Sequence, residues 1–173
     1  SIDDPASYWV VVNKLRPLAI QGYEAADLVA VPVPYINEPY LRQAASDAVV
    51  AMFGAITAET GLQLQAQSAY RSYSTQESVY AGWVDSLGQE AADLTSARPG
   101  HSEHQLGTAL DLRLPTKAAL DWLAEHAADF GFALSYLAGK QRITGYRPEP
   151  WHVRFVGRAA ADQIRRNGWT VEE

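Results

Sequence analysis

The sequence predicts an α+β domain with a mostly antiparallel central sheet and flanking helices. Stretches with helical spacing of apolar residues are interleaved with short alternating runs that are typical of strands. The chain has 173 residues, of which 47% are hydrophobic and 20% charged, and this size and composition fit one globular domain. No repeat, low-complexity tract or linker divides it.

Residues 1–36 contain four prolines and only short apolar runs, so we expect an extended arm packed on a body formed by residues 37–173. The clearest helical pattern opens that body. Asn37 is suited to cap the helix, Pro39 to occupy its first turn and Gly61 to end it. Its apolar residues recur three and four apart and predict one buried face, formed by Leu41, Ala44, Ala45, Ala48, Val49, Met52, Phe53 and Ile56.

A strand is predicted next, over residues 62–68, where apolar residues alternate with polar ones. It leads to Arg71 at its end, a place where functional residues often lie. The segment Ser74-Thr-Gln-Glu77 has the spacing of a capping box and predicts a second helix that reaches Leu87. Residues 88–103 are expected to form an irregular loop.

The remaining elements follow from the same signals. Thr116 is suited to cap a helix that Gly131 ends, and Gly168 to end the last helix. The predicted elements are strands at 109–114, 132–136 and 151–155 and helices at 116–131 and 157–167.

Charge and cysteine content limit the partners and the metal ligands that this protein can use. The net charge is −6, which argues against nucleic acid as a partner, because nucleic-acid binding normally needs a basic face. There is no cysteine, so disulfides and thiolate metal sites are excluded and only histidine and carboxylate remain as strong metal ligands.

Neither a membrane span nor a leader is visible in this sequence. It has no run of eighteen or more apolar residues, and the acidic start Ser1-Ile-Asp-Asp-Pro5 is not followed by an apolar segment. We interpret the start as a trimmed or mature form, which is compatible with the removal of a signal or membrane anchor.

Two short segments about forty residues apart carry the residue types of a catalytic zinc site. The first is Ser102-Glu-His-Gln-Leu-Gly-Thr-Ala-Leu-Asp111, and the second is Glu149-Pro-Trp-His152. We expect His104, Asp111 and His152 to be ligands, which leaves one coordination position for water. Glu149 is then the base that takes a proton from this water and returns it to the leaving amine.

The spacing between the first two ligands predicts the local structure. Asp111 follows His104 by seven positions, too many for one helical turn, so we expect a turn or loop that leads into a strand carrying Asp111. Gly107 and Ala109 are small and allow a tight turn between them. His101 lies three residues before His104 and is an alternative ligand by spacing alone.

The two segments resemble the signature of VanY-type D-alanyl-D-alanine carboxypeptidases, which belong with lysostaphin-like enzymes and the hedgehog fold. The resemblance spans most of the chain, and its motifs occur in the family's order. Besides the two segments above, they are Val12–Leu18, Ser68–Tyr73 with Gln76, Arg98–His104, Gly131-Phe132, Thr144-Gly-Tyr146 and the continuation of the second segment to Gly157.

The resemblance implies a role for each residue of the site. It implies zinc on His104, Asp111 and His152, with Glu149 the base and His101 either a support behind the ligands or a structural residue. Arg71 is implied to face the scissile carbonyl or the substrate carboxylate, where its planar fork of donors suits an oxyanion. The implied substrate contacts are Gln76 and Ser102 on the terminal D-alanine carboxylate and Tyr136, Tyr146 and Trp151 as pocket walls.

The chain departs from the family at one place. Relatives often carry Arg-Tyr-Pro where this sequence has Ser135-Tyr-Leu137.

The function implied by the resemblance is a zinc carboxypeptidase that removes the terminal D-alanine from peptidoglycan stem peptides, with D,D or L,D specificity left open. We expect it to act as a monomer outside the cytoplasm, in the cell wall or a periplasm-like space. The alternatives are an endopeptidase of the same fold and a non-catalytic, zinc-containing wall-binding module. Loss of the base would mark the last of these, and Glu149 is present.

Overall fold

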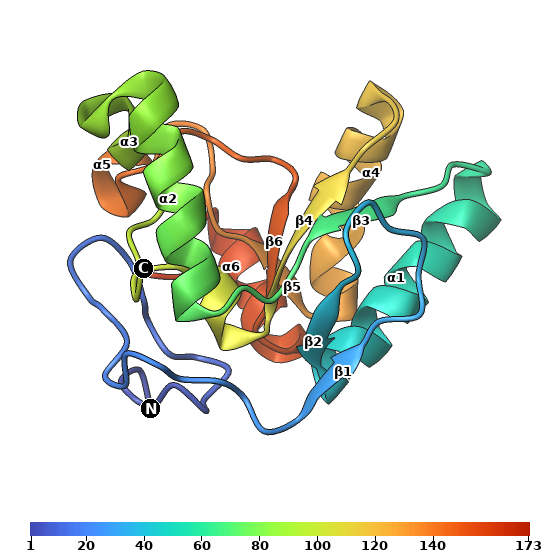
Figure 1. The fold of residues 1–173 in the computed structure, drawn as a ribbon. Coiled ribbons are helices and arrows are strands. Elements are labelled where there is room, and N and C mark those ends of the chain that lie inside the picture. The colour runs from blue at the N-terminus through green and yellow to red at the C-terminus, as the bar shows by residue number, and fades with distance from the viewer.

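The computed structural model describes residues 1–173 and has a four-stranded antiparallel sheet at its centre (Figure 1). The strands are β3 (Gln65–Ser68), β4 (Ala109–Arg113), β5 (Phe132–Leu134) and β6 (His152–Phe155). Their order in the sheet is β3-β4-β6-β5, and every neighbouring pair is antiparallel. The predicted α+β fold with a mostly antiparallel sheet is confirmed.

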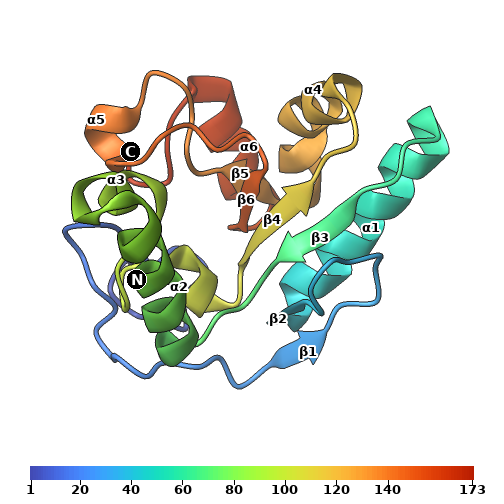
Figure 2. The same ribbon diagram turned by 45° about the horizontal axis from the view of Figure 1, so that its top comes forward.

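One face of the sheet packs on the main hydrophobic core. Helices α1 (Gln43–Thr60) and α4 (Lys117–His126) lie together on this side, with the 3-10 helix η2 (Ala127–Phe130) following α4 (Figures 1 and 2). The core joins residues from both helices and all four strands, including Val49, Met52, Ile56, Ala66, Leu110, Leu123, Phe132 and Val153. Most of the apolar face predicted for the first helix is therefore buried as expected.

The other side of the molecule holds shorter elements. Helices α2 (Tyr73–Leu87) and α3 (Gln89–Thr95) pack on each other, and α5 (Gln141–Thr144) lies near them (Figures 1 and 2). Helix α6 (Arg158–Asn167) packs on β5 and η2. The N-terminal segment adds a small apolar cluster in which Val10, Val12 and Leu18 surround Leu106.

The first helix begins later than predicted. Residues Tyr40–Arg42 form strand β2, which pairs with β1 (Leu28–Ala30), so α1 begins at Gln43 and Arg42 occupies the N-cap position. Asn37 is not a cap, because its side-chain amide donates to the Gln67 carbonyl (2.7 Å). The helical spacing of apolar residues continued into residues 40–42, and this led to the wrong prediction. Pairing with β1 makes this segment a strand, because tertiary contacts override local propensity.

The second helix and the loop after it also differ from prediction. The N-cap of α2 is Ser72, whose hydroxyl accepts from the Thr75 backbone N–H (3.1 Å), two residues before the predicted cap. Residues 88–103 are not wholly irregular, because α3 occupies the first part. Gly88 has a φ of 79° and turns the chain directly from α2 into α3, whose Ala92 is fully buried.

The helix predicted at 116–131 is present, with Thr116 as its cap and a left-handed Gly131 as its end. The last helix also ends at Gly168 as predicted. The division of the chain at residue 36 stays a prediction.

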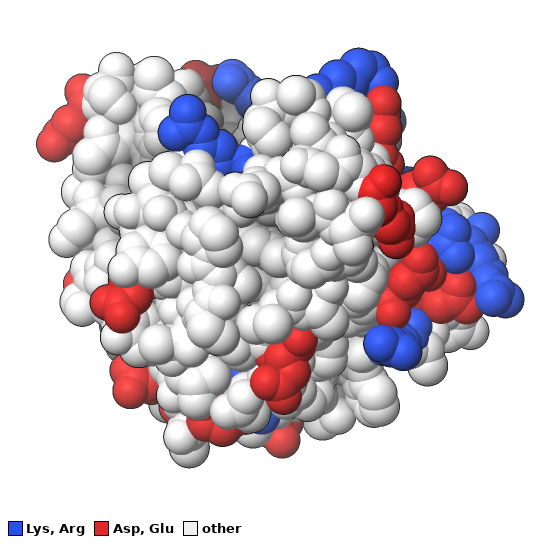
Figure 3. All heavy atoms as spheres, turned by 90° about the vertical axis from the view of Figure 1, so that its right-hand side faces the viewer, with Lys and Arg blue, Asp and Glu red and all other residues white.

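No helix has both the length and the apolar character needed to cross a membrane. On the face seen in Figure 3, which is the right-hand side of Figure 1, the middle is largely uncharged. The charged side chains lie mainly toward the edges, where basic ones are mixed with acidic ones on the right of the view.

Gly131 gives a test of the packing at the end of η2. Its φ is 89°, and a Cβ atom there would lie 2.8 Å from Phe155 Cε2 and 3.2 Å from the Arg158 backbone nitrogen. Gly131→Ala should therefore lower the free energy of unfolding by about 1–3 kcal/mol, measured by urea denaturation.

Gly54→Ala is the matched control, because Gly54 lies within α1 and a Cβ there would meet nothing within 4 Å. It should leave stability unchanged or raise it by up to about 1 kcal/mol. Equal effects of the two substitutions would contradict this account of Gly131.

Candidate metal centre and active site

The site is built on the face of the sheet that points away from the main core. In β4, Leu110 and Leu112 are buried in the core while Asp111 between them points to the other face. In β6, Val153 enters the core and His152 and Arg154 take the opposite face. Since Asp111 pairs directly with His152, the strand register brings these two side chains together.

His104 reaches the same place from a short 3-10 helix, η1 (Glu103–Leu106), that precedes β4. The Ser102 hydroxyl caps this turn by accepting from the His104 backbone N–H (3.2 Å). Gly107 ends it in the left-handed region, with a φ of 71°, and a Cβ atom there would lie 2.7 Å from Leu28 Cδ2. The predicted tight turn between His104 and the strand of Asp111 is therefore present.

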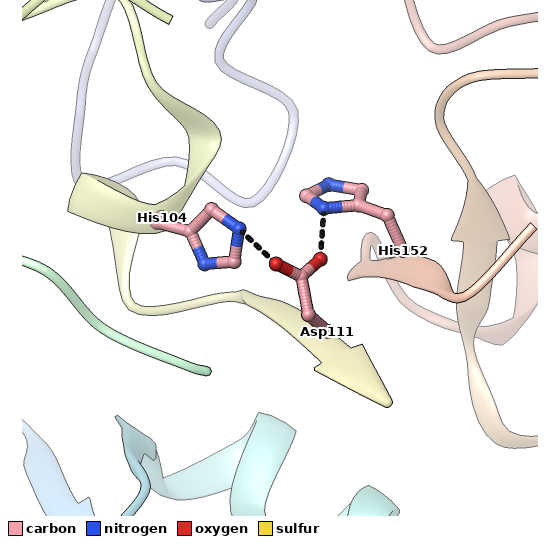
Figure 4. A group of neighbouring side chains, drawn as sticks. All are labelled: His104, Asp111 and His152. Carbon is pink, nitrogen blue, oxygen red and sulfur yellow. Dashed lines mark hydrogen bonds and ion pairs between the residues drawn. The ribbon is translucent and has the colours of Figure 1, made fainter. Parts of the chain in front are cut away.

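The structure brings His104, Asp111 and His152 into one cluster (Figure 4). Asp111 lies between the two imidazoles, with Oδ2 at 3.2 Å from His104 Nε2 and Oδ1 at 2.8 Å from His152 Nδ1. One ligand atom from each residue lies within 4.8 Å of the others. Two nitrogens and a carboxylate oxygen from three residues form the donor set of many catalytic zinc sites, which keep a fourth position open.

The outer nitrogen of each imidazole is held by the protein. His104 Nδ1 donates to the Ala69 carbonyl (2.7 Å), and His152 Nε2 donates to Glu103 Oε2 (2.8 Å). Because each outer nitrogen carries a hydrogen, both rings present their other nitrogen to the common centre. The two histidines are thus oriented as a metal site requires.

The charges of the cluster are strongly coupled. Burial lowers the pKa of His104. Burial also acts to lower the pKa of His152, but its hydrogen bonds to Asp111 and Glu103 outweigh this and raise that pKa to about 10. Burial acts to raise the pKa of Asp111, and the nearby histidines lower it well below its ordinary value. A metal ion that enters the centre must therefore displace a proton from His152 Nδ1.

Glu149 lies beside this cluster and is not part of it. Its Oε2 atom is 4.0 Å from His152 Nδ1. Burial raises the pKa of Glu149 to about 7, and His152 opposes this shift while Asp111 and Glu103 add to it. A carboxyl group with a pKa near neutrality can both take up and release a proton at physiological pH.

A cavity of about 370 Å³ opens onto the cluster. Its lining includes all three candidate ligands and Glu149, together with Arg71, Ser102, Tyr136, Tyr146 and Trp151. Tyr136 packs on both Tyr146 and His152, with ring centroids 5.1 Å and 4.8 Å apart. Nine of the ten residues that the sequence analysis singled out therefore surround one cavity.

Gln76 is the exception, because its side chain is fully buried behind the cavity wall. Its Oε1 accepts from Arg71 Nε (2.9 Å), and its Nε2 donates to the Ala97 carbonyl (2.7 Å) and Ser96 Oγ (3.2 Å). A second bond, from Arg71 Nη1 to Ser68 Oγ (2.6 Å), completes the support of the guanidinium. In this structure Gln76 orients Arg71 and does not itself face the cavity.

His101 lies away from the cluster. Its Nδ1 is 2.8 Å from the Asn13 carbonyl, and it lines a separate cavity of about 270 Å³ with Lys14 and Arg98. The spacing of His101 and His104 could not distinguish between them, and the fold places only His104 at the centre.

Sequence reasoning missed two charged residues behind the cluster, Glu103 and Arg154. Both are buried, and Arg154 Nη1 donates to Glu103 Oε1 (2.9 Å). Ser135 donates its hydroxyl to Glu103 Oε2 (2.7 Å). Their positions next to the predicted ligands could have identified them. Glu103 directly precedes His104, and Arg154 follows His152 by two residues and so lies on the same face of the strand.

Comparison with known proteins identifies relatives of this chain. The family model described as VanY, D-alanyl-D-alanine carboxypeptidase, matches residues 38–158. YodJ of Bacillus subtilis, which carries the name of a carboxypeptidase, is 36% identical over the full length of this chain and 68% of its own.

Solved structures agree with the sequence match. The LdcB LD-carboxypeptidase superposes with a TM-score of 0.88 at 36% identity, over 97% of this chain and 85% of its own. The D,D-pentapeptidase VanY in complex with Zn(II) superposes with a TM-score of 0.84 at 29% identity, over 95% of this chain and 97% of its own.

The raised pKa of Glu149 predicts a pH dependence of stability in the metal-free protein. The folded pKa is about 7 and the ordinary value is 4.5, so the folded state binds the proton more tightly than the unfolded state. The contribution to stability is full below the ordinary pKa and is lost as pH rises through 7. Wild type should lose roughly 1–3 kcal/mol relative to Glu149→Gln between pH 5 and 8.

Urea denaturation of both proteins with a chelator present, at several pH values, measures this difference. Stability curves that run parallel for wild type and Glu149→Gln would show that Glu149 has an ordinary pKa.

Proposed function

The chain belongs to the VanY family of D-alanyl-D-alanine carboxypeptidases, and on that premise we propose that it is a zinc peptidase that removes the terminal D-alanine from peptidoglycan stem peptides. The observation that carries the proposal is the cluster of His104, Asp111 and His152 at a cavity that also contains Glu149. Its substrate lies in the cell wall, so the proposed place of action is outside the cytoplasm. The proposed working state is a monomer.

The residues present fit a zinc ion. Two imidazole nitrogens and one carboxylate oxygen converge, and the outer nitrogen of each ring is already committed to a hydrogen bond. We assign His104, Asp111 and His152 as the ligands. When bound, zinc supplies a Lewis acid that polarises the scissile carbonyl and activates water near neutral pH.

Glu149 is the proposed base. Its carboxylate lines the cavity within 4.0 Å of His152, close to the metal ligands but outside the cluster that binds the ion. It takes the proton from the attacking water and passes it to the amine of the leaving D-alanine, which departs as a neutral amine. A pKa of about 7 suits both steps.

Arg71 is the proposed electrostatic partner of the substrate. Its guanidinium lines the cavity, while Gln76 and Ser68 hold its Nε and Nη1 atoms. Burial lowers the pKa of Arg71, and the nearby Asp111 and Glu149 counter this, so the side chain stays charged. A fixed guanidinium can bind the developing oxyanion or the free carboxylate of the substrate without reorganising.

The remaining cavity residues are proposed to bind the end of the peptide. Tyr136 and Tyr146 form an aromatic wall, Trp151 is 42% exposed at the cavity, and Ser102 supplies a hydroxyl. An L,D preference is supported by the higher identity to the LD-carboxypeptidase than to the D,D-pentapeptidase, 36% against 29%. The proposed preferred substrate is therefore a tetrapeptide stem whose terminal D-alanine follows an L-centre.

Defined muropeptides test this proposal. Zinc-loaded protein should convert tetrapeptide stems to tripeptides with the loss of one alanine, faster than it shortens pentapeptides, as measured by mass spectrometry. A tetrapeptide with a C-terminal carboxamide is the control, and it should react slowly because the free carboxylate is missing. Internal fragments would indicate an endopeptidase, and an unchanged set of peptides with zinc bound would indicate a wall-binding module.

Substitutions separate the base from the ligands. Glu149→Gln should keep equimolar zinc and lower kcat by about 10²–10⁴-fold, as measured by metal analysis and alanine release. His104→Ala should lose both zinc and activity.

His101→Ala is the matched control for the ligand assignment, since His101 contacts Asn13 away from the cluster. It should keep zinc. Full zinc content in His104→Ala, or full activity in Glu149→Gln, would contradict the assigned roles.

A further inference from the structure

Glu103 lies behind the proposed metal centre and takes no part in the chemistry described above. Its side chain is 5% exposed, and its Oε2 atom accepts the hydrogen of His152 Nε2 at 2.8 Å. It does not line the active-site cavity. Because a buried carboxylate is energetically unfavourable and this one has no catalytic role, its position requires another physical explanation.

The surrounding donors fix Glu103 in position. Ser135 donates to Oε2 (2.7 Å) and Arg154 Nη1 donates to Oε1 (2.9 Å). Arg154 is itself fully buried and donates through Nη2 to the Val10 carbonyl (2.5 Å). An isolated buried carboxylate is strongly unfavourable, so these bonds both stabilise the charge and hold its orientation.

The position of Glu103 decides which nitrogen of His152 faces the centre. A carboxylate accepts and cannot donate, so Nε2, which faces Glu103, carries a hydrogen. Nδ1 donates to Asp111 Oδ1 (2.8 Å) in the metal-free protein, and it is the nitrogen left to exchange its hydrogen for a metal ion. His104 has the Ala69 carbonyl in the equivalent place, at 2.7 Å from Nδ1. The two ligand histidines thus have different outer partners, a neutral carbonyl for one and an anion for the other.

We propose that Glu103 is a positioning residue for the metal centre, which orients His152 and strengthens it as a ligand, with Arg154 and Ser135 holding the carboxylate in place. This inference rests on the proposed function, because it requires that the cluster binds zinc. An anionic acceptor on the outer nitrogen makes the imidazole a better donor to the metal, and losing such a partner lowers metal affinity by about 10–100-fold.

Zinc affinity measured by competition with a chelating dye tests the proposal without a turnover assay. Glu103→Gln keeps the shape and removes the charge. The double variant Glu103→Leu with Arg154→Met removes both buried charges, which avoids an unpaired arginine in the interior. Both should bind zinc more weakly, by about 10–100-fold in the double variant, while circular dichroism of the metal-free proteins shows that they are folded.

Ile56→Ala controls for general destabilisation. Ile56 is fully buried in α1 within the main core, on the side of the sheet away from the site, and its truncation should lower the urea midpoint of unfolding. It should leave the zinc affinity of the folded protein unchanged. Nitrogen-15 spectra of the zinc-loaded wild type should also show His152 protonated at Nε2, a signal that depends on the proposed geometry.

The outcomes separate this inference from the proposed function. Wild-type protein that binds no zinc would overturn both. Wild-type protein that binds zinc, with equal affinity in both Glu103 variants, would overturn the role of Glu103 alone. An equal loss of affinity in Ile56→Ala and the Glu103 variants would also overturn it, because the effect would then follow from stability.

Discussion

The direct pairing of β4 with β6 is the constraint on which the site depends. It sets Asp111 opposite His152, and the two-residue period of the strands sends Leu110 and Val153 into the core on the other face. The same residues that hold the sheet on α1 and α4 therefore fix where the candidate ligands point. A slip of one residue in β4 would turn Asp111 into the core and a neighbouring leucine toward the cavity.

A buried network of charged side chains lies behind the paired residues Asp111 and His152. Glu103, His152 and Arg154 are all buried. They bond to one another, to Asp111 and Ser135, and to backbone carbonyls of the N-terminal segment, while Arg154 Nε has no partner. The N-terminal segment is thus linked to the site by a chain of hydrogen bonds. The Val10 carbonyl accepts from Arg154, Arg154 donates to Glu103, and Glu103 accepts from His152. Such a network stabilises the fold only while every member is paired, since one unpaired buried charge is strongly unfavourable.

Much of the secondary structure could be predicted from the sequence because its signals are local. The end of α1 at Gly61, the cap of α4 at Thr116 and the end of η2 at Gly131 depend on residues adjacent in the chain. The start of α1 could not be predicted, because residues 40–42 become a strand only through pairing with residues 28–30. Helix α3 was missed because its short segment packs on α2 and has no long periodic pattern of its own.

The sequence alone determined the chemistry available to this protein. Its lack of cysteine left histidine and carboxylate as ligands, and the spacing of two motifs identified three candidate ligands and a base. The tertiary structure decided which of His101 and His104 reaches the cluster and that Gln76 lies behind Arg71. It also decided that Glu103 and Arg154 lie buried behind His152. Residue types and their spacing can be read directly from the sequence. The direction and burial of each side chain depend on which strands pair and on the face of the sheet where the side chain then lies.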